Sequence, residues 1–138
     1  MDFEQFEDNH IADATVRRFV AELRSFEQTG EVGELAKLFT DDAVLHRLDG
    51  RGGVDDPRAF WEQYRAQFGE VRTVFRNAVE STDPPGAGLE WESRGTLADG
   101  TRIDYAGSTF LTLADHRICG LRTYYDTAAF IAIPAGQG

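Results

Sequence analysis

The residues best suited to chemistry lie close to the C-terminus, where Arg122-Thr123-Tyr124-Tyr125-Asp126 brings together a carboxylate, a guanidinium and two phenols. A carboxyl group in an apolar pocket can act as an acid or base near neutral pH, and phenols or guanidinium groups stabilise an oxyanion. We therefore predict that Asp126 transfers protons. The alternative is that it accepts hydrogen bonds at a strand end and fixes the C-terminal segment.

His46 is a second candidate for proton transfer, because a neutral imidazole suits this role at physiological pH. It lies in an apolar stretch typical of a strand. Side chains alternate along a strand, so only one of Leu45 and His46 can face a pocket. A hydrogen-bonded histidine without a chemical role is the other interpretation.

Three strands between residues 89 and 126 are expected to position these groups, because apolar and polar residues alternate there. A hairpin turn at 98–100 would place Trp91 opposite Gly107. A second turn at 114–117 would place Thr109 opposite Arg122. One face of the sheet is then expected to form a pocket wall with Trp91, Ser93, Tyr105, Thr109, Arg122, Tyr124 and Asp126.

The opposite face of these strands is expected to be charged at one end and apolar at the other. Glu90, Glu92, Arg94 and Asp104 would form the charged part, and Phe110, Cys119, Leu121 and Tyr125 the apolar part. An apolar patch of this kind marks an interaction surface. We predict that it packs on a second subunit, giving a homodimer through the sheet.

Helices in the first half of the chain are expected to close the pocket. Apolar residues recur every three or four positions from Val16 to Phe26, and Gly30 ends this helix. Asp56 as N-cap and Pro57 begin another helix, which ends near Gly69. Arg17, Arg18, Glu22 and Glu27 are expected on the exposed side of the first helix.

Aromatic residues of these segments would supply a wall for a flat or cyclic ligand, although aromatic stripes are also typical of plain core. Leu35, Leu38 and Phe39 are expected to point inward from a short second helix, followed by a strand at 43–47. A long strand is expected at 72–80 and a turn at 83–88. The ligand-binding candidates are Phe19, Trp61, Tyr64, Phe68, Phe75, Trp91, Thr109 and Arg122.

Length and composition indicate one globular domain with a core at about 12–130 and loose termini at 1–10 and 131–138. The chain has 138 residues, 41% of them hydrophobic, and a net charge of −10. This charge disfavours nucleic acid and anionic membranes as partners. No apolar run approaches the roughly 20 residues of a membrane span, and the acidic N-terminus does not resemble a secretory signal. A cytoplasmic location is expected.

Neither a metal nor a cofactor is expected. The three histidines lie far apart, without the spacing typical of metal ligands. Cys119 is the one cysteine, and we predict a small buried hydrophobic side chain rather than a nucleophile.

The order of predicted elements indicates an α+β fold, with helices on one side of a curved sheet. Three features resemble the SnoaL-like branch of the nuclear transport factor 2-like superfamily: Leu38-Phe39-Thr40-Asp41-Asp42-Ala43-Val44, the aromatic third helix, and the ending with Asp115, Ile118, Tyr124, Tyr125 and Asp126. The resemblance spans Ala12 to Phe130. It implies a cone-shaped α+β barrel with a deep pocket, usually a homodimer packed through its sheets.

This superfamily includes ketosteroid isomerases, polyketide cyclases, limonene epoxide hydrolases, dehydratases and non-catalytic binding modules. Alignment with the ketosteroid isomerases places their catalytic aspartate base at Arg47. Their oxyanion-hole tyrosine falls at Phe19 and their oxyanion-hole aspartic acid at about Thr109. Since all three groups differ here, steroid isomerisation by that mechanism is not expected.

Alignment with the limonene epoxide hydrolases retains Asp126 as the last aspartate of their triad. Their Arg-x-Asp pair falls on Glu90 and Glu92, or on Trp91 and Ser93 in a register shifted by one residue. Neither placement supplies the arginine. Epoxide hydrolysis would therefore need a rearranged site.

We expect a pocket for a small hydrophobic, cyclic molecule. An enzyme of this kind would carry out cofactor-independent isomerisation, cyclisation or dehydration of a carbonyl compound. Asp126 and His46 would move protons, and Tyr105, Tyr124 or Arg122 would stabilise the oxyanion. Alternatively, Arg122 would simply bond to Thr109 across the ladder. The rival function is a non-catalytic ligand-binding or interaction module.

Overall fold

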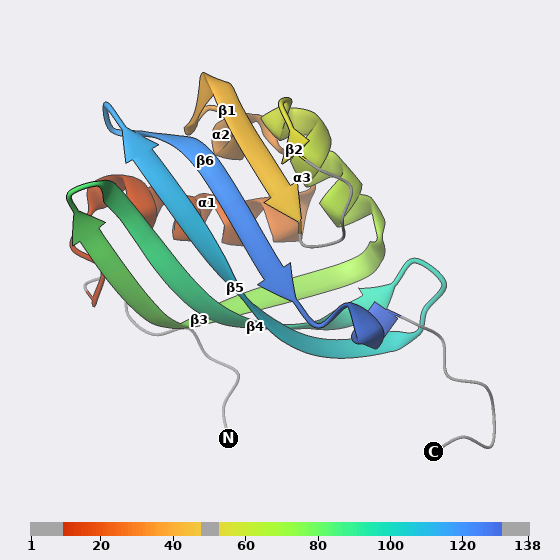
Figure 1. Ribbon diagram of the computed structural model, residues 1–138. Coiled ribbons are helices and arrows are strands. Elements are labelled where there is room, and N and C mark those ends of the chain that lie inside the picture. The colour runs from red at the N-terminus through yellow and green to blue at the C-terminus, as the bar shows by residue number, and fades with distance from the viewer. Residues whose placement is uncertain (1–9, 48–52, 131–138) are drawn as a thin grey trace.

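The computed structural model describes residues 10–47 and 53–130 and confirms the α+β class (Figure 1). Six strands form one mixed sheet in the order β2-β1-β6-β5-β4-β3, with β1 and β6 parallel and the other pairs antiparallel. The sheet curves around the helices without closing into a barrel. The elements are α1 (Ala14–Thr29), α2 (Gly33–Ala36), β1 (Phe39–Arg47), β2 (Gly53–Val54), α3 (Pro57–Ala66), β3 (Phe68–Thr82), β4 (Pro85–Leu97), β5 (Arg102–Ala114), β6 (Arg117–Tyr125) and the 3-10 helix η2 (Thr127–Phe130).

Helix α1 lies across the concave side of the sheet and buries the predicted apolar face (Figure 1). Asp13 caps its N-terminus, and Gly30 ends it in a left-handed conformation with φ of 76°. The expectation that Glu27 is exposed is wrong, because only 3% of its surface remains accessible. Glu27 follows Leu23 by one helical turn and therefore belongs to the buried face.

Helix α3 begins as predicted. The Asp56 carboxylate accepts a hydrogen bond from the backbone N–H of Ala59 at 3.2 Å, and Pro57 occupies the first turn. The predicted turn at 83–88 is shorter than expected, because β4 already begins at Pro85. Strands β3 and β4 thus form a long ribbon that carries one wall of the core.

The predicted register of the β4–β5 hairpin is confirmed. Trp91 lies opposite Gly107 and Ser93 opposite Tyr105. The charged residues Glu90, Glu92, Arg94 and Asp104 lie on the exposed face, as predicted. This hairpin therefore presents Trp91, Ser93 and Tyr105 to the interior.

The predicted register of the β5–β6 hairpin is wrong beyond its first residue pair. Leu113 pairs with Ile118 as predicted, but a bulge at Cys119 shifts the following pairs, so that Thr109 lies opposite Thr123. One extra residue moves every later side chain of β6 to the other face of the sheet. Thr123 and Tyr125 therefore face inward, in the places predicted for Arg122 and Tyr124.

The same bulge changes the outer face of the sheet. Leu121 is 1% exposed and lies in the core, and Tyr125 also faces inward, so neither belongs to the predicted apolar outer patch. Phe110 remains on that face and is 39% exposed. Cys119 is half-buried rather than buried, and its thiol lies 3.4 Å from the carbonyl oxygen of Thr112. None of the helices in the described residues is long and apolar enough to cross a membrane.

Candidate functional site

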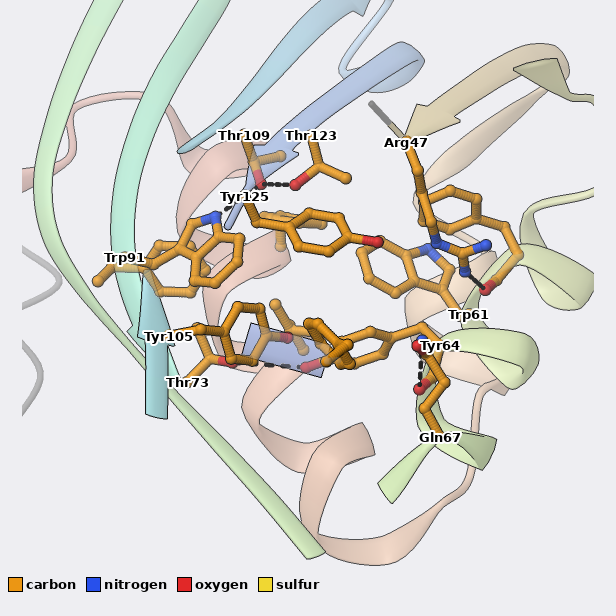
Figure 2. A pocket seen from close by; sticks show the side chains of 15 residues that line it. Arg47, Trp61, Tyr64, Gln67, Thr73, Trp91, Tyr105, Thr109, Thr123 and Tyr125 are labelled. Atoms are coloured by element: carbon orange, nitrogen blue, oxygen red, sulfur yellow. Dashed lines mark hydrogen bonds between the residues drawn. The ribbon is translucent and has the colours of Figure 1, made fainter. Parts of the chain in front are cut away.

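A pocket lies between the concave face of the sheet and helices α1 and α3 (Figure 2). Its lining is mainly aromatic, and the space that the centre of a water-sized molecule can occupy measures about 50 Å³. The predicted lining residues that the structure places there are Phe19, Trp61, Tyr64, Phe75, Trp91, Tyr105 and Thr109. Leu23, Arg47, Phe60, Gln67, Thr73, Thr123, Tyr125 and Phe130 also line it and were not predicted.

Asp126 does not line this pocket. It is exposed, and its carboxylate accepts a hydrogen bond from the backbone N–H of Ala128 at 3.0 Å. This contact holds the turn into η2, which agrees with the second of the two interpretations of Asp126. The predicted pairing of Asp126 with Tyr105 across the ladder is wrong, because the bulge in β6 shifts the register by one residue and the Asp126 backbone N–H donates to Ala106 instead.

Five other predicted residues also lie outside the pocket lining, and one of them, Ser93, is 1% exposed within the core. His46 is exposed because Leu45 takes the inward position on β1. Arg122 and Tyr124 lie on the outer face, where both pack against the ring of Phe110. Phe68 is buried behind the pocket and stacks on Tyr105, with 6.3 Å between the ring centroids.

The two tryptophans of the pocket differ in their hydrogen bonding. The indole N–H of Trp91 donates to the hydroxyl of Thr109 at 2.9 Å, and this hydroxyl lies 3.0 Å from that of Thr123. Trp61 is 6% exposed, and its indole N–H finds no acceptor among the described residues. A buried donor without a partner is unfavourable. The Trp61 Nε1–H is therefore a buried donor that the described residues leave without a partner.

Arg47 enters the pocket beside Trp61 (Figure 2). Its guanidinium donates to the backbone carbonyl of Phe60 at 2.7 Å and lies 4.1 Å from the centroid of the Phe60 ring. It is the one charged side chain among the described lining residues. Alternation from the inward-facing Leu45 was the signal that could have predicted this orientation.

Glu27 lies behind the pocket at the centre of a buried hydrogen-bond network. Its carboxylate accepts from the backbone N–H of Thr73 at 2.8 Å, from the Thr73 hydroxyl at 2.6 Å and from the Tyr64 hydroxyl at 2.5 Å. The Thr73 hydroxyl also lies 2.6 Å from that of Ser93, which hydrogen-bonds to Tyr105. The network therefore links a buried carboxyl to three residues that line the pocket.

Burial determines the proton affinities in this network. It raises the pKa of Glu27, against the opposing effect of the hydrogen bonds from Thr73 and Tyr64. Burial also raises the pKa of Tyr64 and of Tyr105, and the Glu27 carboxylate adds to both shifts. Neither phenol ionises by itself near neutral pH, so Glu27 is the residue of this network suited to hold or release a proton.

Metal ligands are not clustered in the described part of the chain. Within residues 10–47 and 53–130, no group of three histidine, cysteine, aspartate or glutamate side chains is arranged to hold a metal ion.

The curved sheet, the three helices and the enclosed pocket define the class of nuclear transport factor 2-like folds. A protein of this class from Anabaena variabilis has a TM-score of 0.75 at 13% identity and covers 94% of this chain and 98% of its own. One of unknown function from Exiguobacterium sp. 255-15 has a TM-score of 0.68 at 21% identity, covering 83% and 99%. The BvnE pinacolase from Penicillium brevicompactum has a TM-score of 0.72 at 11% identity, covering 90% and 92%.

Within this class, the model of the SnoaL-like domain matches residues 16–121. The chain belongs to the SnoaL-like domain family. A search of curated protein sequences gives no match.

Proposed function

We propose that the pocket binds a small hydrophobic, cyclic compound with an acceptor oxygen such as a ketone, and that the protein moves a proton on it without a cofactor. The Trp61 indole N–H carries this proposal, because it is buried, unpaired among the described residues and part of an aromatic lining. Pockets with apolar walls and a few oriented polar groups are typical small-molecule sites.

The energetic reason for an acceptor oxygen lies in the unpaired donor. A buried N–H without an acceptor costs about 1–3 kcal/mol, and a ligand oxygen would remove that cost. The positive charge of Arg47 on the same side of the pocket would favour an oxygen that becomes negative during reaction. The site therefore supports a carbonyl compound better than a hydrocarbon.

Isomerisation, cyclisation or dehydration are the reactions that such a site would support. In its base-catalysed form, each begins with removal of a proton next to a carbonyl group and benefits from a stabilised oxyanion. The similarity to a pinacolase concerns the fold alone.

Trp61→Phe tests the binding site, because it removes the N–H and keeps a ring. With 2-tetralone as a bicyclic ketone probe, we expect the Kd from isothermal titration calorimetry to rise about fivefold to tenfold. Tyr124→Phe, which removes a hydroxyl on the outer face, serves as the control and should bind as the wild type does. Equal affinity of Trp61→Phe and wild type would contradict the proposal.

We also propose that the outer face of the sheet forms a homodimer. Phe110 on β5 and Val44 on β1 are 39% and 38% exposed, and such apolar surface favours a partner. Light scattering after size exclusion should give twice the chain mass of 15.4 kDa for the wild type and one chain mass for Phe110→Glu. Ala66→Glu introduces the same charge at an exposed position of α3, away from the sheet, and should remain dimeric. A monomeric wild type would contradict this arrangement.

A further inference from the structure

We propose that Tyr64 is the residue that exchanges a proton with the ligand, and that Glu27 behind it receives and returns that proton. This inference rests on the proposed function, since it assigns residues to the proton transfer. Asp126 and His46 are exposed and do not line the pocket, so neither of the residues predicted to move the proton can reach a ligand there.

The positions of the two side chains support this assignment. Tyr64 lines the pocket from α3, and its hydroxyl points to Thr73 on the sheet (Figure 2). Glu27 is 3% exposed on α1 and is not part of the lining, so it does not meet a ligand itself. The hydrogen bond of 2.5 Å from the Tyr64 hydroxyl to Glu27 Oε2 is the path between pocket and carboxylate.

The proton transfer balances without any further reactant. A C–H bond next to the ligand carbonyl breaks, and its proton moves to the Tyr64 oxygen. The original Tyr64 proton moves at the same time to Glu27 Oε2. The C–H electron pair forms the enolate double bond, and the carbonyl π pair moves to the oxygen. The reverse transfer returns a proton to the ligand and restores both side chains.

Thr73 is the positioning residue that holds Glu27 as the proton acceptor. Its backbone N–H holds Oε1 and its hydroxyl holds Oε2, so the carboxylate cannot turn away from Tyr64. The titratable or charged groups that face Glu27 are Tyr64 and Arg65 from α3 and Tyr105 from β5. Of these, only Arg65 is cationic, and its charge favours the ionised carboxylate that the transfer requires.

A purely structural network would also hold α1 against α3 and β3, so the test needs a readout beyond stability. Proton exchange of 2-tetralone in D2O, followed by 1H NMR, measures C–H transfer directly. In the wild type, we expect the protein-dependent exchange rate to rise with pH through the pKa of Glu27. The 13C resonance of the Glu27 carboxyl measures that pKa independently.

Two variants interrupt the path at different points. Glu27→Gln and Tyr64→Phe should each lower the protein-dependent exchange about 100-fold while 2-tetralone still binds. In Tyr64→Phe, the Glu27 carboxyl should still titrate, so this variant decides the question even where Glu27→Gln is poorly folded. Glu31→Gln makes the same chemical change at an exposed site just beyond α1 and should exchange as the wild type does.

The outcomes separate this inference from the proposed function. Exchange that persists in both variants with an unchanged pH profile would overturn the roles of Glu27 and Tyr64 alone. A wild type that binds 2-tetralone without accelerating its exchange would overturn the proposed proton transfer and this inference with it. Loss of exchange in both variants, with the pH profile of the wild type following the Glu27 titration, is the result we expect.

Discussion

Glu27→Ala is expected to lower the free energy of unfolding by about 3–5 kcal/mol, because it removes the acceptor of a buried network. Three donors would lose their partner: the backbone N–H of Thr73, its hydroxyl and the hydroxyl of Tyr64. The truncation would also leave a cavity between α1 and β3. Urea unfolding at neutral pH, followed by circular dichroism, measures the change.

Glu31→Ala is the matched control, since Glu31 is exposed and its side chain has no described contact of this kind. Its free energy of unfolding should stay within about 0.5 kcal/mol of the wild type. A loss below about 1 kcal/mol in Glu27→Ala would show that the network does not hold α1 against the sheet.

The raised pKa of Glu27 also predicts in which direction the stability changes with pH. Burial raises the pKa of Glu27 in the folded state above its usual value of 4.5, so folding favours the protonated form. The resulting stabilisation is fully present below pH 4.5 and is lost as the pH rises through the folded-state pKa. The free energy of unfolding of the wild type, compared with that of Glu27→Gln, should therefore fall as the pH rises from 4.5 through the folded-state pKa of Glu27. A difference that is constant with pH would contradict the raised pKa.

Gly107→Ala is expected to destabilise the protein by about 1–3 kcal/mol through overpacking. A methyl group at this position would lie 2.7 Å from the Cζ2 atom of Trp91 and against the backbone carbonyl of Tyr124. The rigid indole ring would have to move, and its hydrogen bond to Thr109 would break with it. Thermal unfolding should show a lower Tm, and 2-tetralone should bind more weakly because Trp91 lines the pocket.

Gly33→Ala provides the comparison for this change. A methyl group at Gly33 meets no atom within 4 Å, and the position opens the short helix α2. Its Tm should match that of the wild type. If Gly107→Ala were equally harmless, Trp91 would not be held against β5 as the structure describes.

Local signals in the sequence predicted the helices and the first hairpin. Gly30 supplied the left-handed end of α1, and Asp56 with Pro57 supplied the start of α3, because each acts within one turn of its own position. Alternation along β4 fixed the register that places Trp91 opposite Gly107. The apolar wall of the pocket followed from these elements.

The acid/base residues could not be predicted in the same way. The bulge at Cys119 exchanges the faces of Arg122 and Thr123 and leaves Asp126 outside the pocket. Gly120, directly after it in the strand, is the kind of residue that often marks a bulge, but it does not say which residue is left unpaired. The four-residue spacing from Leu23 did place Glu27 on the buried face of α1. A carboxylate is nevertheless expected in water unless its partners are known. Those partners, Tyr64 and Thr73, come from distant segments that only the folded chain brings together.

The most direct test of the ligand site is the 1H–15N spectrum of the indole N–H groups during titration with 2-tetralone. The chain has two tryptophans, so two signals are expected, and Trp61→Phe assigns them. The Trp61 proton should move downfield as it gains an acceptor, whereas that of Trp91, already bonded to Thr109, should move much less. A Trp61 signal that stays in place at saturation would contradict the proposed site.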